Sequence, residues 1–126
     1  MVDIQAEIKA IELMIFEHQE ANLCKDLDRM MNLFTEDIIY HVPYYPPVKG
    51  KETLRALLDD VKDRMDKLII TSEKTEVSSS GDIAFNTGLA KIKYIREDFD
   101  EYKYFLGLRK TFDGWKIAVD TFSTNG

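Results

Sequence analysis

Cysteine, basic residues and long apolar runs are scarce in this sequence, and each scarcity excludes a class of protein. Cys24 is the only cysteine among 126 residues, so an internal disulfide is impossible and a reducing compartment, the cytoplasm, is expected. Acidic residues outnumber basic ones by 23 to 17, and the net charge of −6 disfavours nucleic acids and anionic membrane surfaces as partners. Residues 1–16 carry acids among apolar side chains, so we expect a soluble protein with neither a secretory signal nor a membrane span.

The motifs of metal, nucleotide and serine-hydrolase sites are missing as well. His18 and His41 are the only histidines, and the chain has no histidine or cysteine pair with metal-ligand spacing. It also has no glycine-rich phosphate loop and no GxSxG turn. We therefore expect no metal and no other cofactor. With 44% hydrophobic residues, the chain fits one domain, residues 1–126, with one core.

Apolar residues at helical spacing predict three helices in the first half of the chain. The stripe of the first helix begins apolar and ends polar, and it comprises Ile4, Ile8, Ile11, Ile15, His18 and Asn22. A second, shorter helix follows Lys25, with Asp26 as its N-cap. A third helix follows Gly50, and its apolar face comprises Leu54, Leu57, Leu58, Val61, Met65 and Leu68.

The second half of the chain changes to a two-residue period, which predicts strands. A short strand is also expected in the first half, at residues 38–42. The three prolines that follow it end this strand. Further strands are expected near residues 69–79, 82–95, 101–112 and 115–123. Helices first and a meandering antiparallel sheet last indicate an α+β fold.

The last predicted strand is apolar on both faces. Strict alternation places Trp115, Ile117 and Val119 on one face, and Asp120 and Phe122 on the other. A sheet that is apolar on both faces needs a cover on each side. Helices supply one cover, and a second copy of the chain is the expected other. We therefore predict a homodimer through Trp115, Ile117 and Val119.

Five segments, in this order and spacing, resemble the nuclear transport factor 2-like superfamily, which includes ketosteroid isomerase and the SnoaL-like polyketide cyclases. They are KDLD at 25–28, LFTED at 33–37, YHVP at 40–43, GKE at 50–52 and DGWKI at 113–117. The resemblance implies a cone-shaped α+β barrel, in which three N-terminal helices pack in a strongly curved, mixed, mostly antiparallel sheet. It also implies an apolar pocket at the open end of the cone, with the YHVP strand along its wall.

The resemblance also shows where this chain departs from ketosteroid isomerase. Val42 stands where that enzyme has its general-base aspartate, and Leu108 stands where it has its protonated aspartate. Neither side chain exchanges protons, so the same reaction by the same groups is not expected. His18 falls at the position of the isomerase's hydrogen-bonding tyrosine, and it also lies on the inward stripe of the first helix.

His18 and Asp120 are the candidate acid–base pair. A neutral histidine there would donate to an oxyanion or act as a base. A carboxyl among the apolar neighbours that the resemblance implies would have a raised pKa. The alternatives are a helix-end histidine bonded to a carbonyl or to water, and an aspartate at a fraying strand end that is salt-bridged to a lysine.

Tyr40 is the third candidate catalytic residue, as a group that orients a ligand oxygen, although such a tyrosine is often only a wall of the pocket. Its neighbour His41 should face the other way, because strand side chains alternate. Tyr44 at the rim would stack on a flat ligand or cover the prolines. The expected ligand-binding residues are Val42, Tyr44, Tyr102, Tyr104, Leu106, Leu108 and Phe122.

These residues support two functional hypotheses. The first is an enzyme that moves a proton on a small apolar carbonyl compound without a cofactor, as an isomerase, a cyclase or a dehydratase. The second is a non-catalytic module that binds an apolar ligand or works through its dimer surface. An open cavity in which the His18 and Asp120 side chains lie within about 3–4 Å of each other, or are bridged by one water, would favour the first. A cavity closed by Tyr40, Tyr102 and Tyr104 would favour the second, as a module limited to assembly.

Overall fold

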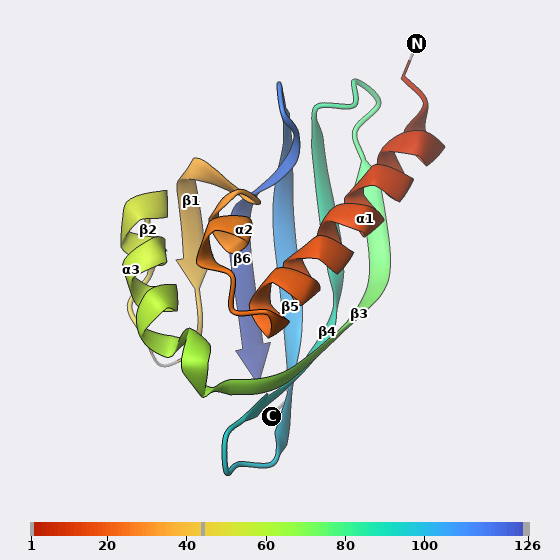
Figure 1. Cartoon of the computed structure of the whole chain (residues 1–126). Coiled ribbons are helices and arrows are strands. Elements are labelled where there is room, and N and C mark those ends of the chain that lie inside the picture. The colour runs from red at the N-terminus through yellow and green to blue at the C-terminus, as the bar shows by residue number, and fades with distance from the viewer. Residues whose placement is uncertain (1, 44, 125–126) are drawn as a thin grey trace.

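The computed structural model describes residues 2–43 and 45–124. Figure 1 shows three helices on one side of a six-stranded sheet. The helices are α1 (Ile4–Leu23), α2 (Leu27–Met31) and α3 (Lys51–Val61), and a 3-10 turn at Lys62–Arg64 follows α3. The strands are β1 (Phe34–His41), β2 (Val48–Lys49), β3 (Met65–Val77), β4 (Ile83–Tyr94), β5 (Phe99–Thr111) and β6 (Gly114–Thr124).

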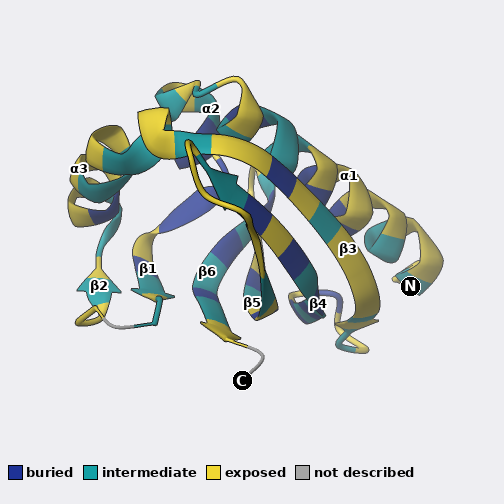
Figure 2. Ribbon diagram, turned by 90° about the horizontal axis from the view of Figure 1, so that it is seen from below, coloured by how far each residue is buried: buried dark blue, intermediate teal, exposed yellow. Residues whose placement is uncertain are grey.

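The sheet has the strand order β2-β1-β6-β5-β4-β3. The β1–β6 pair is parallel and the other pairs are antiparallel. Seen nearly along the strands, the sheet curves around the side on which the helices lie (Figure 2). The sheet is open, with β2 and β3 at its two edges, so the α+β prediction is confirmed and the shape is that of an open cone.

Polar side chains begin the first two helices. The Asp3 carboxylate accepts a hydrogen bond from the Ala6 amide, and the Asp26 carboxylate accepts one from the Arg29 amide. The N-cap predicted at Asp26 is therefore confirmed. Helix α1 buries Ile11, Met14 and Ile15 against the sheet, and no helix among residues 2–43 and 45–124 is long and apolar enough to cross a bilayer.

The third helix ends earlier than its apolar spacing predicts. Met65 and Leu68 belong to β3, where Leu68 pairs with Ile92 of β4. The Lys25 ammonium donates to the carbonyls of Lys62 and Met65 and so satisfies backbone acceptors where the 3-10 turn ends. Met65 and Leu68 continue the helical spacing of α3 by chance. Whether they form helix or strand is decided by the pairing of β3 with β4.

A β-bulge in β6 changes the face on which two predicted interface residues lie. Gly107 pairs with Val119 and Leu108 pairs with Ile117, so Ala118 is an extra residue and the alternation shifts there. As a result Trp115 and Ile117 point toward the helices, on the same side as Asp120. Both are buried, and the Trp115 indole N–H donates to the Glu7 carboxylate at 2.6 Å.

The predicted outer face of Trp115, Ile117 and Val119 is therefore wrong for its first two members. Only Val119 lies on the outer face, where a groove also contains the stacked rings of Phe85 and Phe105, with centroids 5.7 Å apart. The core lies on the opposite side of the sheet, between its concave face and the helices (Figure 2).

Candidate functional site

A cavity of about 100 Å³ lies between the concave face of the sheet and the C-terminal half of α1. Its walls come from α1, β1, α3, β3, β4, β5 and β6. It is lined by His18, Asn22, Phe34, Tyr40, Leu58, Val61, Met65, Leu68, Ile70, Ala90, Ile92, Tyr94, Tyr104, Leu106, Asp120 and Phe122. The three candidate catalytic residues, His18, Tyr40 and Asp120, thus share one cavity although they are far apart in the sequence.

The expected ligand-binding residues divide into two groups. Tyr104, Leu106 and Phe122 line the cavity. Val42 follows the end of β1 and Leu108 lies in the core opposite Ile117, and neither lines the cavity. Tyr102 also lies outside the lining, with its ring edge-on to Phe122 at 5.5 Å. Tyr44 lies outside the described residues, and His41 is exposed.

Asp120 is a buried carboxyl in an apolar setting. Its side chain is on the inner face of β6, and the residue is 4% exposed. Its strand neighbours are Tyr40 of β1 and Leu106 of β5. Burial raises the pKa of the Asp120 carboxyl to about 7, because low-dielectric surroundings penalise the charged form. The group can therefore exist in either protonation state near neutral pH.

His18 is the polar end of the buried stripe on α1. Its Nδ1 atom is buried and has no hydrogen-bond partner within the part of the chain that the structure describes. The imidazole packs edge-on against Phe34, with centroids 5.8 Å apart. Burial lowers the pKa of His18 to about 4, so the ring is neutral at physiological pH. A neutral imidazole has one donor and one acceptor nitrogen.

His18 and Asp120 face the same cavity without direct hydrogen bonding between the two side chains. No ion pair or hydrogen bond joins them in the described structure, and the pKa of each is shifted by burial and not by the other group. The arrangement is therefore two polar groups on different walls of one apolar cavity. A ligand that fills the cavity would contact both.

Tyr40 places a phenol beside Asp120. The Tyr40 ring packs edge-on against Phe122 at 5.8 Å. Burial and the neighbouring Asp120 carboxyl hold the pKa of the Tyr40 phenol well above its usual value. The hydroxyl therefore stays protonated and is able to donate a hydrogen bond to a ligand oxygen.

Asn86, which was not among the predicted site residues, is fully buried in a hydrogen-bond network. The Tyr104 hydroxyl donates to the Asn86 side-chain oxygen at 2.6 Å. The Asn86 amide nitrogen donates to the hydroxyls of Ser72 and Thr75, at 2.7 and 2.8 Å, on either side of the bulge in β3. Asn86 thus fixes Tyr104 as a wall of the cavity. A lone asparagine in an apolar strand was the signal for this role.

The described residues that line the cavity include no lysine or arginine. Among residues 2–43 and 45–124 there is also no group of three or more His, Cys, Asp or Glu side chains placed to hold a metal ion. The chemistry that the described lining offers is therefore that of one carboxyl, one neutral imidazole and tyrosine hydroxyls in apolar surroundings.

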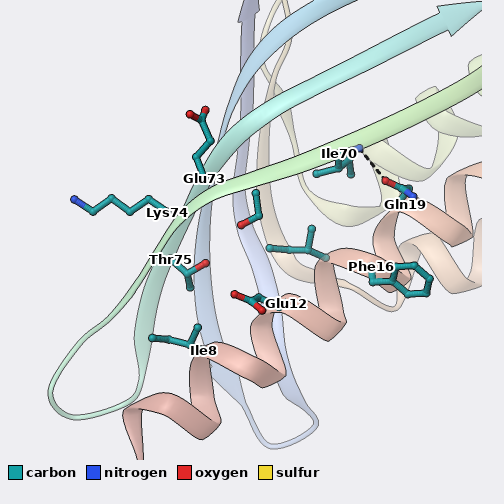
Figure 3. A pocket seen from close by; sticks show the side chains of 10 residues that line it. Ile8, Glu12, Phe16, Gln19, Ile70, Glu73, Lys74 and Thr75 are labelled. Carbon is teal, nitrogen blue, oxygen red and sulfur yellow. Dashed lines mark hydrogen bonds between the residues drawn. The ribbon is translucent and has the colours of Figure 1, made fainter.

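A second hollow, a groove of about 540 Å³, separates α1 from the edge strand β3 (Figure 3). The side chain of Gln19 accepts a hydrogen bond from the Ile70 amide at 2.8 Å across it. In Figure 3, Glu12 and Thr75 point toward the space between the two elements, whereas Lys74 points away. The charged groups of this groove are exposed, so it has no buried acid or base like those of the cavity. The cavity is the candidate site.

Comparisons with known proteins agree with this architecture. Residues 17–124 match the SnoaL-like domain family. The chain is similar to the structure of a ketosteroid isomerase-like protein from Erwinia carotovora atroseptica, with 20% identity, a TM-score of 0.81, and coverage of 95% of this chain and 97% of that chain. No curated protein matches the chain.

Two further solved structures share the fold. A proposed dehydratase of the NTF2-like family from Streptomyces avermitilis has 16% identity and a TM-score of 0.82, with coverage of 97% of this chain and 98% of that chain. A proposed scytalone dehydratase from Novosphingobium aromaticivorans has 19% identity and a TM-score of 0.80, with coverage of 97% of this chain and 86% of that chain. At these identities the likeness to the three solved structures establishes the fold alone.

Proposed function

The chain belongs to the SnoaL-like domain family, and we propose that it binds a small, largely apolar carbonyl compound in the cavity and moves a proton on it without a cofactor. One observation carries this proposal. The buried carboxyl of Asp120, with a pKa of about 7, opens onto an apolar cavity beside two uncharged polar side chains, His18 and Tyr40. A general base works best when its pKa is close to the operating pH.

In the proposed reaction, the Asp120 carboxylate takes a proton from a carbon next to the ligand's carbonyl group. The electron pair of the C–H bond moves into an enolate, whose oxygen gains negative charge. The Tyr40 hydroxyl or the neutral His18 imidazole donates a hydrogen bond to that oxygen, in surroundings where such bonds are stronger than in water. Return of the proton from Asp120 to a different carbon gives an isomer, and its transfer to a leaving hydroxyl gives water and a dehydrated product.

Proton exchange between simple ketones and solvent tests this proposal. Cyclopentanone and acetophenone are incubated with the protein in D₂O, and loss of the signal of the protons next to the carbonyl is followed by NMR. The protein should accelerate exchange, and Asp120→Asn should abolish the acceleration. Asp113→Asn is the matched control, because it removes a carboxylate at an exposed turn. This variant should accelerate ketone exchange as much as the wild type does. Equal exchange by the wild type and Asp120→Asn would contradict the proposal.

The outer face of the sheet supports a second candidate function, a homodimeric module that works through this surface. Phe85 and Phe105 stack there, and together with Ile83 and Val119 they line an apolar groove of about 510 Å³. Ile83 is 61% exposed and Phe105 is 41% exposed. Exposed aromatic and branched side chains that gather on one face are typical of a protein interface.

A further inference from the structure

The carboxyl of Asp120 combines deep burial with the lack of a cation, and this combination sets it apart from the other acidic side chains of the described residues. Several carboxylates nearer the surface do have a cation beside them, as Glu17 has Arg29 at 2.6 Å and Asp37 has Arg109 at 3.2 Å. Asp120 is the most deeply buried acid of the described residues, and it has neither an ion pair nor a side-chain hydrogen bond there. An ionised carboxylate in such a place is costly unless a cation comes to it.

The walls around Asp120 are suited to a cation. Aromatic rings from several elements line the cavity, namely Phe34, Tyr40, Tyr94, Tyr104 and Phe122. The face of an aromatic ring carries partial negative charge and attracts an ammonium group. Two polar lining groups also have lone pairs, on the Tyr40 oxygen and on the acceptor nitrogen of neutral His18.

We infer that the cavity binds small primary amines in their protonated form, with the ammonium group on the Asp120 carboxylate and the apolar part of the molecule against the aromatic walls. An ammonium has three N–H donors. Asp120, Tyr40 and His18 provide three acceptors on β6, β1 and α1. The described lining contains no lysine or arginine to hold an anion. The inference rests on the proposed cavity as a ligand site, and it extends the substrate class to compounds that carry an amine.

The expected pH dependence of amine binding follows from the titratable groups that line the cavity together with Asp120. They are His18 from α1, Tyr40 from β1, Tyr94 from β4 and Tyr104 from β5. The histidine is neutral above pH 4, and the three tyrosines stay protonated because burial raises their pKa values. Only Asp120 changes charge between pH 5 and 8 in this set. Amine binding should therefore strengthen as the pH rises through 7, whereas binding of a neutral analogue should not.

Three probes with one shared ring separate the effect of charge from that of shape. They are benzylamine, benzyl alcohol and sodium benzoate, and binding is measured by calorimetry or NMR titration at pH 8 and pH 5.5. At pH 8 we expect benzylamine to bind about tenfold more tightly than benzyl alcohol, and benzoate to bind most weakly. Benzylamine affinity should fall about 30-fold at pH 5.5, where most of the Asp120 carboxyl is protonated. Equal affinities of the amine and the alcohol at pH 8, or an amine affinity that does not change with pH, would overturn the inference.

Variants identify the residue responsible and separate the two proposals. Asp120→Asn should remove the preference for the amine, while Asp113→Asn, with the same change in net charge, should keep it. Circular dichroism checks that each variant is folded. The pH dependence of amine binding by the wild type tests the inference even if a variant does not fold. Acceleration of ketone exchange without a preference for the amine would contradict the amine inference alone. Amine binding without acceleration of ketone exchange would contradict the proton-transfer proposal alone. A protein that binds none of the probes would contradict both.

Discussion

Asp120 and His18 owe their chemical character to burial, which shifts their pKa values in ways that leave both groups uncharged over one pH range. Burial raises the pKa of Asp120 to about 7 and lowers that of His18 to about 4, so both side chains are mostly neutral between these values. Above pH 7 the cavity acquires one negative charge from Asp120. A proton can thus be exchanged at neutral pH by one group while the other remains an uncharged hydrogen-bonding partner.

The raised pKa of Asp120 has a consequence for stability. Its protonated form is favoured by the fold, so its contribution to stability is complete below pH 3.8 and is lost as the pH rises through 7. Asp120→Asn should therefore increase the free energy of unfolding at pH 8, by on the order of 4 kcal/mol at most, and change it little at pH 4. Urea denaturation at the two pH values measures this difference. An asparagine variant that is less stable than the wild type at pH 8 would show that the carboxylate has favourable partners.

The inward orientation of His18 could be predicted from the sequence, because it continues a helical stripe of isoleucines. The inward orientation of Asp120 and Phe122 was predicted from strand alternation together with the family resemblance. The same alternation failed for Trp115 and Ile117, because it was counted across Ala118, where the bulge adds one residue. A bulge depends on pairing with a neighbouring strand, which local periodicity does not contain.

At the scale of elements, β3, β4 and β5 are held close together where they form the wall of the cavity. Gly88 of β4 pairs with Ser72 of β3 on one side and with Tyr104 of β5 on the other. A β-carbon at residue 88 would lie 2.1 Å from the Thr71 carbonyl oxygen and 2.8 Å from the Tyr104 hydroxyl. Glycine therefore allows the Tyr104 ring to cross β4 and its hydroxyl to reach Asn86.

Gly88→Ala should destabilise the protein by about 1–3 kcal/mol or more, because backbone atoms must move to admit the methyl group. Gly107→Ala on β5 is a suitable control. Its nearest contact would be the side chain of Val119 at 3.2 Å, which can adjust, so a smaller loss is expected. Thermal or urea unfolding compares the two variants. Equal stabilities would mean that close approach at Gly88 does not constrain the sheet.

The boundary between α3 and β3 shows why one wall of the cavity was missed. Met65 and Leu68 continue the apolar spacing of α3, and the sequence alone predicts them as helical. In the structure they are in β3 and line the cavity. The apolar pattern predicted their burial correctly, but only pairing with β4 decides that they form a strand wall.

At the scale of the whole molecule, the family resemblance predicted more than the local patterns did. The order of short segments in the sequence indicated a curved sheet around a long first helix, and the fold and the family match confirm it. The position of the cavity follows from that fold. Its small volume and the lack of cationic side chains in its described lining depend on side-chain packing, which the order of elements does not determine.

The proposed dimer predicts a specific effect on assembly. Phe105→Glu places a charge in the apolar groove of the outer face and should convert a dimer into monomers, because burying an unpaired charge is costly. Phe112→Glu makes the same substitution at a fully exposed residue in the β5–β6 turn and should leave assembly unchanged. Sedimentation velocity measures both. A wild type that is monomeric at high concentration, or a dimer that survives Phe105→Glu, would refute this interface.

The proposed chemistry depends most directly on the ionisation of Asp120 in the folded protein. Carbon-13 NMR of the aspartate carboxyl groups, recorded across pH 3 to 9, measures it, and the Asp120 signal is assigned by its loss in Asp120→Asn. We expect a midpoint near pH 7, the value that burial in the cavity gives this carboxyl. A midpoint near pH 4 would mean that Asp120 is solvated or paired, and the proposed proton transfer would then lack its base.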